Sequence, residues 1–413
     1  MKYSFLLFLI LSLTSILAQK KEVFDLELRI DAENKKISVE GNATADFKNN
    51  DTLKLVLWKY SSIKKIESLE SKINYFFDTL SASPAMYIAG GRSLYVIKPK
   101  GSHTIQNISF SYECDMKELK GWANSFQENW IELNYYSAWY PVGLKTGDAK
   151  SKIKIYTGDK YFVSGSGIIS KADGYWLMEQ PWNWFDNVVI VSDNLKSKKF
   201  SKDGASIEVV YNTYPEAGAD SIISECKFAL ELFEKLFGKI DSTQLRFAIA
   251  PFEIGGGYSR KNFICMRTTQ YNHNTLRGIG HEIAHFWWNK AVTSTWEDWL
   301  NESFAEYSML VYFRERFGQD FYNKQIDEYL ESIKDTPAIW SISRNDNQAY
   351  VVLYQKGAVI LHEFEKHVGS QKFFNFLKMV NEQKVSNTND FMKLVENIFS
   401  VETKNWFEAK LKS

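Results

Sequence analysis

The chain has 413 residues, of which 45% are hydrophobic and 15% aromatic, so it is long enough to form two domains with separate cores. Lysine and arginine together number 50, as do aspartate and glutamate, which makes the formal net charge zero. A neutral chain lacks the basic surface that nucleic-acid binding requires, so no nucleic-acid partner is expected. Three scattered cysteines, Cys114, Cys226 and Cys265, allow at most one disulfide. We expect buried free thiols.

The N-terminus has the pattern of an export signal. One lysine precedes an apolar run over residues 3–18, and Gln19 and two lysines follow it. The run is shorter than the roughly 20 residues that a membrane-spanning helix needs, which favours cleavage after Ala18 over a retained anchor. We therefore predict a signal peptide over residues 1–18 and an exported protein, periplasmic or extracellular, without stable membrane insertion.

The first half of the mature chain reads as strands. Short alternating runs are bounded by Gly, Asn, Asp and Ser, at residues 24–31, 36–47, 53–59, 93–100, 108–114, 152–157, 161–170 and 187–193. Many short strands with few helix signals predict an antiparallel β-sandwich or saddle-shaped domain over residues 20–200. Two tryptophan-rich stretches, 121–141 and 174–185, are consistent with a sugar- or peptide-binding platform, but aromatic filling of a β core is the favoured interpretation.

The second half has helical periodicity. Residues 217–238 carry apolar side chains at helical spacing and end at Gly238, a suitable C-cap. A strand over 242–251 follows, and helices are predicted at 275–288, 295–318, 350–369 and 371–383 with shorter ones beyond. These elements predict a mainly helical domain with a small sheet over residues 201–413, and the whole chain is expected to be a multidomain α+β protein.

The stretch HEIAH, residues 281–285, has the spacing of a metal site. On a helix, His281 and His285 lie on one face and can direct imidazole nitrogens at one cation about 2 Å away. Glu282 projects roughly 100° round the helix, beside the metal, where it can take a proton from water held by that metal. Two core histidines four residues apart are the alternative, so a third ligand is needed.

The next helical segment, WLNESFAEY, offers that ligand. Glu302 and Glu306 lie on one face of it. Two histidines and one glutamate leave a fourth tetrahedral position for water, as in catalytic zinc sites. We assign Glu302 as the ligand. Glu306 is either a hydrogen-bond partner of a ligating histidine or part of a solvated helix face, and the two interpretations are equally open.

These residues resemble a known family, the aminopeptidase N family of gluzincin zinc metallopeptidases. The family combines HExxH with a W..N.VT pattern and a WLNEGFA block. Trp287, Val292, Thr293 and residues 299–305 fit that pattern, and the strand-rich first half resembles the family's N-terminal β domain. The resemblance implies a thermolysin-like catalytic domain and one Zn2+ per chain. It also implies a short member of the family without the large C-terminal helical domain, and therefore a more open cleft.

Two differences and one further match qualify the resemblance. The family has eighteen residues between the second histidine and the glutamate, whereas residues 286–301 make sixteen here, and a loop between two helices tolerates that shortening. The segment LYQKGA resembles the family's YEKGA, whose tyrosine donates a hydrogen bond to the tetrahedral intermediate, and Tyr354 corresponds to it. Without the resemblance, Tyr354 would equally well be a packed residue at a helix start.

The second difference concerns substrate binding. The family's GAMEN segment supplies a glutamate that grips the free amine of the substrate, and Tyr258 stands at that position here. The glycines Gly255, Gly256 and Gly257 can still let a peptide pair with this strand edge. Glu132, nine residues before Pro141, fits the spacing of another amine-contacting residue of the family. A structural glutamate is the favoured alternative for Glu132.

The favoured hypothesis is an exported zinc metallopeptidase with aminopeptidase-like activity. His281, His285 and Glu302 would hold zinc, Glu282 would act as general base, and Tyr354 would steady the oxyanion. Loss of the amine-binding glutamate leaves an endopeptidase open. A catalytically silent peptide-binding relative and a zinc hydrolase of non-peptide bonds are the remaining alternatives.

Overall fold

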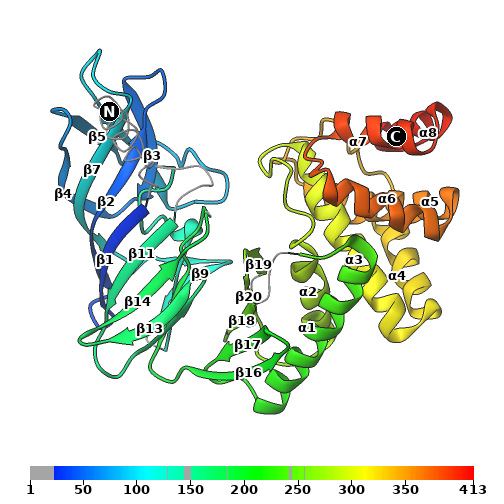
Figure 1. Ribbon diagram of the computed structural model, residues 1–413, viewed down its shortest axis with the longest axis horizontal. Coiled ribbons are helices and arrows are strands. Elements are labelled where there is room, and N and C mark those ends of the chain that lie inside the picture. The colour runs from blue at the N-terminus through cyan, green and yellow to red at the C-terminus, as the bar shows by residue number, and fades with distance from the viewer. Residues whose placement is uncertain (1–22, 128, 144–149, 184, 241–243, 255) are drawn as a thin grey trace, which may run out of the picture. The chain divides into compact units, whose positions relative to one another are not determined.

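The computed structural model describes residues 23–127, 129–143, 150–183, 185–240, 244–254 and 256–413 (Figure 1). The chain divides into two compact units, Met1–Lys120 with Asn124–Val191, and Gly121–Ala123 with Ser192–Ser413. The sequence had suggested a boundary after residue 200, but strand β16 (Lys196–Lys202) pairs within the sheet of the second unit. The predicted signal peptide lies outside the described residues.

The first unit consists of three sheets. Along the largest sheet the strands are ordered β13 (Ile168–Ala172), β14 (Tyr175–Gln180), β11 (Lys150–Tyr156), β1 (Val23–Asp31), β2 (Lys36–Asp46), β7 (Ile105–Asp115) and β4 (Ser61–Ser68). A second sheet has the order β12 (Phe162–Gly165), β15 (Val189–Ser192), β10 (Trp130–Leu133), β9 (Asn124–Gln127) and β8 (Lys120–Gly121). The third contains β3 (Thr52–Trp58), β6 (Gly91–Ile97) and β5 (Asn74–Asp78).

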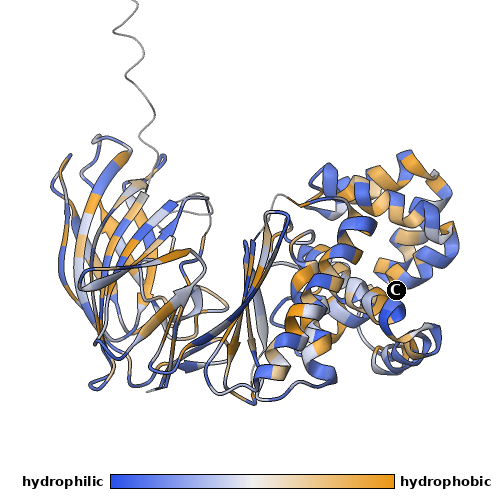
Figure 2. Cartoon of the chain, turned by 60° about the horizontal axis from the view of Figure 1, so that its bottom comes forward, coloured by the Kyte–Doolittle hydropathy of each residue, from blue (hydrophilic) through white to orange (hydrophobic). Residues whose placement is uncertain are grey.

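Alternation of buried and exposed side chains explains why these segments form strands. Along β2, buried and exposed positions alternate at both ends of the strand, and Figure 2 shows the corresponding change of colour along the strands of this unit. Among the strand pairs that the structure describes, the predicted antiparallel arrangement is confirmed except where β1 pairs with β11 in parallel. One predicted strand was wrong. Residues 161–170 form β12 and β13 in different sheets, and the chain bends between them at Ser166 and Gly167.

The tryptophan-rich stretches mainly fill the core of the first unit. Trp130 and Trp139 are fully buried, which confirms the interpretation of core filling at these two positions. The three cysteines are buried and free, as predicted. Trp122 differs, because it is partly exposed and its segment groups with the second unit.

The second unit begins with a five-stranded sheet ordered β16, β17 (Ala205–Tyr211), β18 (Gln244–Ala250), β20 (Phe263–Arg267) and β19 (Gly257–Arg260). Strands β17, β18 and β20 run parallel, whereas β19 pairs antiparallel with β20 and ends the sheet. Helix α1 (Glu216–Phe237) contacts β16 and β17 and ends at Gly238, whose φ of 92° suits glycine. The predicted helix and its C-cap are confirmed.

Helices make up the rest of the unit. After α2 (His273–Ala284) come a short 3₁₀ turn (Trp296–Asp298) and then α3 (Trp299–Phe317), α4 (Gln319–Ser332), a π-helix (Val351–Lys356), α5 (Gly357–Val368), α6 (Ser370–Glu382), α7 (Thr388–Ile398) and α8 (Val401–Lys412). Helix α3 is buried on nearly all sides and contacts α2, α4 and α5, so it is the central helix of this core. Among the described helices, none combines the length and apolar character that crossing a bilayer needs.

Candidate metal centre

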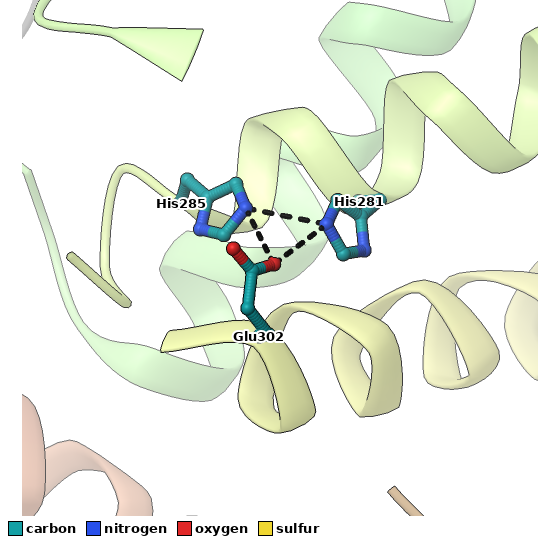
Figure 3. A group of neighbouring side chains, drawn as sticks. All are labelled: His281, His285 and Glu302. Atoms are coloured by element: carbon teal, nitrogen blue, oxygen red, sulfur yellow. Dashed lines mark hydrogen bonds and ion pairs between the residues drawn. The ribbon is translucent and has the colours of Figure 1, made fainter. Parts of the chain in front are cut away.

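Three predicted ligands from two neighbouring helices converge on one point (Figure 3). His281 lies in the last turn of α2 and His285 caps that helix, while Glu302 lies in the first turn of α3. The two Nε2 atoms are 3.2 Å apart, and Glu302 Oε2 lies 3.3 Å from one and 3.4 Å from the other. A tetrahedral zinc ion with bonds of about 2.0–2.1 Å separates its ligand atoms by roughly 3.3–3.4 Å, so the spacing fits zinc.

The far side of each imidazole fixes which nitrogen can face a metal. His285 Nδ1 lies 2.9 Å from the carbonyl oxygen of Trp288, which can only accept a hydrogen bond, so Nδ1 carries the proton. His281 Nδ1 lies 2.8 Å from a carboxylate oxygen of Glu306 and donates to it in the same way. In the neutral form that metal ligation requires, each imidazole therefore has its Nε2 lone pair on the side that faces Glu302.

Glu306 belongs to this centre and not to a solvated helix face, because its side chain is 0% exposed. Besides His281, its carboxylate accepts hydrogen bonds from the Arg277 guanidinium and from the Tyr329 hydroxyl. Arg277 lies one helical turn before His281 on α2, and Tyr329 comes from α4. The buried carboxylate of Glu306 on α3 is thus neutralised by an arginine and held in place by hydrogen bonds from α2 and α4.

The electrostatics favour a positive charge at the centre. Without a metal ion, burial lowers the pKa of His281, but the neighbouring carboxylates of Glu302 and Glu306 outweigh burial and raise this pKa to about 10. Burial raises the pKa of Glu302, yet the neighbouring His285 and His281 hold it well below its usual range. Glu306 likewise has its pKa lowered to about 2, since His281 and Arg277 outweigh the effect of burial. The carboxylates are ionised at neutral pH and attract a cation.

A bound metal ion would also compensate the buried charge of Glu302. Its Oε2 atom is buried and, within the described part of the chain, receives no hydrogen bond of good geometry, although both imidazoles are close. An ionised oxygen without a donor is costly in the interior. Two imidazole nitrogens and one carboxylate oxygen are the donor set of catalytic zinc sites. The residues present therefore fit Zn2+.

Glu282, the predicted general base, lies beside the ligands and is not among the three converging atoms. It is buried, and burial raises its pKa, an effect that the positive charges of His281 and His285 reduce but do not cancel. A carboxylate with a raised pKa is better suited to accept and release a proton near neutrality. A Cβ on Gly257 would lie only 2.7 Å from Glu282 Oε1, so strand β19 approaches this carboxylate as closely as glycine allows.

Tyr354 is brought to the centre by the π-helix. Its ring stacks on that of His281 with centroids 5.7 Å apart and an interplanar angle of 4°. Ser303, next to Glu302 on α3, donates a hydrogen bond of 2.6 Å to the carbonyl of Leu353. A Cβ on Gly357 would lie 1.7 Å from Ser303 Oγ, so only glycine permits this close packing. Short π-helical segments often occur at functional sites.

Strand β19, which begins in the glycine-rich segment, forms the edge of the five-stranded sheet of the second unit, as expected. Gly257 begins β19, and Gly256 precedes it in an exposed position. Gly255 lies outside the described residues. Tyr258 is buried on the opposite face of the strand from Gly257, where its ring packs near Phe263 with centroids 6.3 Å apart. The substrate-binding role suggested for Tyr258 remains a prediction, and it would involve the backbone of this residue.

Glu132 belongs to strand β10 of the first unit and is fully buried. Its carboxylate accepts hydrogen bonds of 3.4 Å from the Trp130 indole and from the Asn134 amide. The substrate-binding role suggested for Glu132 remains a prediction.

Sequence reasoning missed three residues of the centre. Arg277 could have been found, since it precedes His281 by four residues and therefore shares its helix face. Tyr329 and Ser303 gave no such signal, because their partners lie on other elements of the chain.

Comparison with known families and proteins gives consistent results for the second unit. Residues 259–409 match the family described as Peptidase family M1 domain. The chain is 28% identical over 194 residues to Tricorn protease-interacting factor F2 of Thermoplasma volcanium, a match that covers 41% of this chain and 24% of that protein. It is 33% identical over 117 residues to a leucyl aminopeptidase of Saccharolobus solfataricus, covering 24% of this chain and 15% of that protein. The chain thus matches less than a quarter of the length of either relative.

Solved structures extend the likeness to the fold of both units. An M1 zinc metallopeptidase from Deinococcus radiodurans superimposes with a TM-score of 0.71 at 15% identity, covering 95% of this chain and 93% of that one. Leukotriene A4 hydrolase from Saccharomyces cerevisiae gives a TM-score of 0.72 at 17% identity, covering 94% and 67%. At these identities the likeness concerns the fold alone, and it confirms the expected α+β architecture of a sheet-rich domain followed by a helical one.

Proposed function

We propose that the protein is a zinc-dependent metallopeptidase that hydrolyses peptide bonds. The proposal is supported by the match of residues 259–409 to the Peptidase family M1 domain, which agrees with the resemblance to the aminopeptidase N family. One observation carries the proposal. Two imidazole Nε2 atoms and one carboxylate oxygen converge at 3.2–3.4 Å from one another beside a buried glutamate. This donor set, one per chain, is suited to a single Zn2+.

Each residue has a distinct task in this reaction. Zinc, when held by His281, His285 and Glu302, supplies Lewis-acid chemistry that polarises a carbonyl and acidifies water. Glu282 accepts the proton of the attacking water and later passes it to the leaving amine. Tyr354 donates a hydrogen bond to the oxygen that becomes negative in the transition state. Strand β19 provides backbone groups along which an extended peptide can pair.

Aminopeptidase activity is the favoured form of this function, because the matched relatives include a leucyl aminopeptidase. Endopeptidase activity is the second candidate. It is supported by the segment Gly257–Arg260, which carries no carboxylate to bind a substrate amine. If Glu132 binds the amine instead, free peptides will be cleaved faster than blocked ones and replacement of Glu132 by glutamine will abolish the difference.

We also propose that the protein is exported, on the basis of the N-terminal pattern of one lysine, an apolar run and two further lysines. Sequencing of the N-terminus of the mature protein tests this directly. A new terminus at Gln19 supports export, and a retained Met1 in the cell interior contradicts it.

Metal analysis and hydrolysis assays together test the enzymatic proposal. The purified protein should contain one zinc per chain, lose activity on chelation and recover it when zinc returns. A panel of peptides with free and acetylated N-termini separates aminopeptidase from endopeptidase action. The Glu282→Gln variant should keep its zinc while its kcat falls by roughly 10²–10⁴-fold. Peptide binding without turnover by the zinc-loaded wild type would identify a silent relative instead.

A further inference from the structure

Asp298 lies at the start of α3, about one helical turn before Glu302. An aspartate at the start of a helix commonly accepts a hydrogen bond from the backbone of the first turn. The side chain of Asp298 makes no such bond with the described backbone of α3, and the residue is only 1% exposed. A buried carboxylate is costly unless it is paired, so the partners of Asp298 indicate its role.

The two carboxylate oxygens of Asp298 join different parts of the second unit. Oδ1 accepts a hydrogen bond of 2.8 Å from the Asn301 amide. That amide also forms two hydrogen bonds of 3.1 Å with the backbone of Ala291, in the segment that follows His285. Oδ2 lies 3.0 Å from the Arg344 guanidinium, whose side chain is 11% exposed. Among the described residues, none gives Oδ2 a hydrogen bond of good geometry, so the ion pair depends on charge more than on direction.

Arg344 belongs to the segment 333–350, which joins α4 to the π-helix that carries Tyr354. A second contact connects this segment to the turn that precedes α3. The rings of Trp296 in that turn and Trp340 in the segment lie 4.9 Å apart, centroid to centroid. The segment that leads to Tyr354 is therefore held against the start of α3 by an aromatic contact and by an ion pair.

A further contact lies on the other side of Glu302. Ser303, the next residue on α3, donates its hydrogen bond of 2.6 Å to the carbonyl of Leu353, which directly precedes Tyr354. The start of α3 thus holds the neighbouring segment twice, through Asp298 before Glu302 and through Ser303 after it.

Building on the proposed peptidase function, we propose that Arg344 is a positioning residue, whose ion pair with Asp298 fixes the turn that carries Glu302 relative to the segment that carries Tyr354. A metal ligand and an oxyanion donor have to be held within about 0.5 Å of their working positions. The pair also places a positive charge on a buried carboxylate one turn from Glu302. Arg344 acts through Asp298 and takes no part in proton transfer.

The Arg344→Met variant removes the charge and keeps most of the side-chain volume. In the metal-free protein, amide hydrogen exchange should become about tenfold faster in residues 302–306 and 352–357, because the restraint between them is lost. Zinc affinity and, in the zinc-loaded protein, kcat should each fall by roughly ten- to a hundredfold, with little change in KM. The Arg344→Lys variant should retain most of both quantities, since a positive charge remains.

Arg314→Met is the matched control. Arg314 forms an ion pair of 3.0 Å with the buried Glu365, and its side chain is 18% exposed. It lies on α3 itself, roughly 18 Å along the helix from Glu302. This variant should lose stability without a change in zinc affinity, in kcat or in exchange at the start of α3. The Asp298→Asn/Arg344→Met double variant should be no worse than Arg344→Met alone, because both changes remove the same interaction.

The metal-free measurement separates this proposal from the peptidase function. Faster exchange in Arg344→Met, but not in Arg314→Met, supports the positioning role even if the wild type cleaves no peptide, a result that would refute the peptidase function alone. Unchanged exchange, zinc affinity and kcat in Arg344→Met overturn the positioning role in an active enzyme. Equal losses in Arg314→Met and Arg344→Met also overturn it, since both would then act through general stability.

Discussion

The metal centre has an inner side and an outer side that differ in burial and in bonding. The inner side, Glu306 with Arg277 and Tyr329, is a hydrogen-bonded assembly around a fully buried carboxylate. The outer side consists of Gly256, Gly257 and Tyr354. The inner side orients one candidate ligand and its proton, whereas the outer side brings a strand edge and a tyrosine close to the centre. The difference indicates that rigidity and access are supplied by separate residues.

The same combination of carboxylate, arginine and tyrosine occurs away from the metal centre. Glu365 on α5 accepts hydrogen bonds from Arg314 and Tyr307 and is also buried. It stabilises the helical core without a contact to the ligands. This second assembly is therefore a control for the inner side, since it shares the energetics of a buried pair but not the link to His281.

The largest effect is expected from Glu306→Ala on the inner side. The change leaves the charge of Arg277 without its buried partner and should lower the free energy of unfolding by about 3–5 kcal/mol. Zinc affinity should fall roughly 10–100-fold, because His281 loses the acceptor that orients it. Denaturant unfolding of the metal-free protein and competition titration with a zinc chelator measure the two quantities.

The Glu365→Ala variant is the control for this prediction. It should destabilise the protein by a similar amount and leave zinc affinity unchanged. Equal losses of zinc affinity in both variants would show that Glu306 acts only through general stability.

Tyr354→Phe on the outer side should affect turnover and not the metal. Removal of the hydroxyl that we propose donates to the developing oxyanion is expected to lower kcat by roughly 10²–10³-fold with little change in KM. Steady-state kinetics together with zinc analysis test this expectation. A lower zinc content, or a higher KM at unchanged kcat, would place Tyr354 in metal binding or substrate binding instead.

Among Glu306→Ala, Tyr354→Phe and Gly257→Ala, the last should have the smallest effect. The new Cβ would lie 2.7 Å from Glu282 Oε1 and must displace that carboxylate. A displacement of about 1 Å in a catalytic group costs up to roughly a hundredfold in rate, so we expect kcat to fall by about ten- to a hundredfold. Gly158→Ala in the first unit is the control, since its Cβ would lie 3.7 Å from the Tyr161 ring, an ordinary contact. Equal rates for both variants and the wild type would exclude a close approach of β19 to the general base.

Much of the candidate site could be predicted from local patterns. His281 and His285 are four residues apart in a helix, so helical periodicity places them on one face. Glu302 was assigned because the next helical segment offers the carboxylate that a third ligand requires. The edge position of β19 and the C-cap at Gly238 also follow from nearby residues. The division of residues 161–170 between two sheets did not, because it depends on which strands pair at a distance.

By itself, the sequence determined the types and spacing of the candidate ligands and the two-domain α+β class, because helical and strand periodicity are properties of short segments. Only the tertiary structure decided that Glu306 faces His281, that Tyr354 stacks on it and that Gly257 abuts Glu282. Each of these contacts joins separate elements, and its formation depends on how helices and strands pack against one another. That packing is a property of the whole core and cannot be read from any single segment.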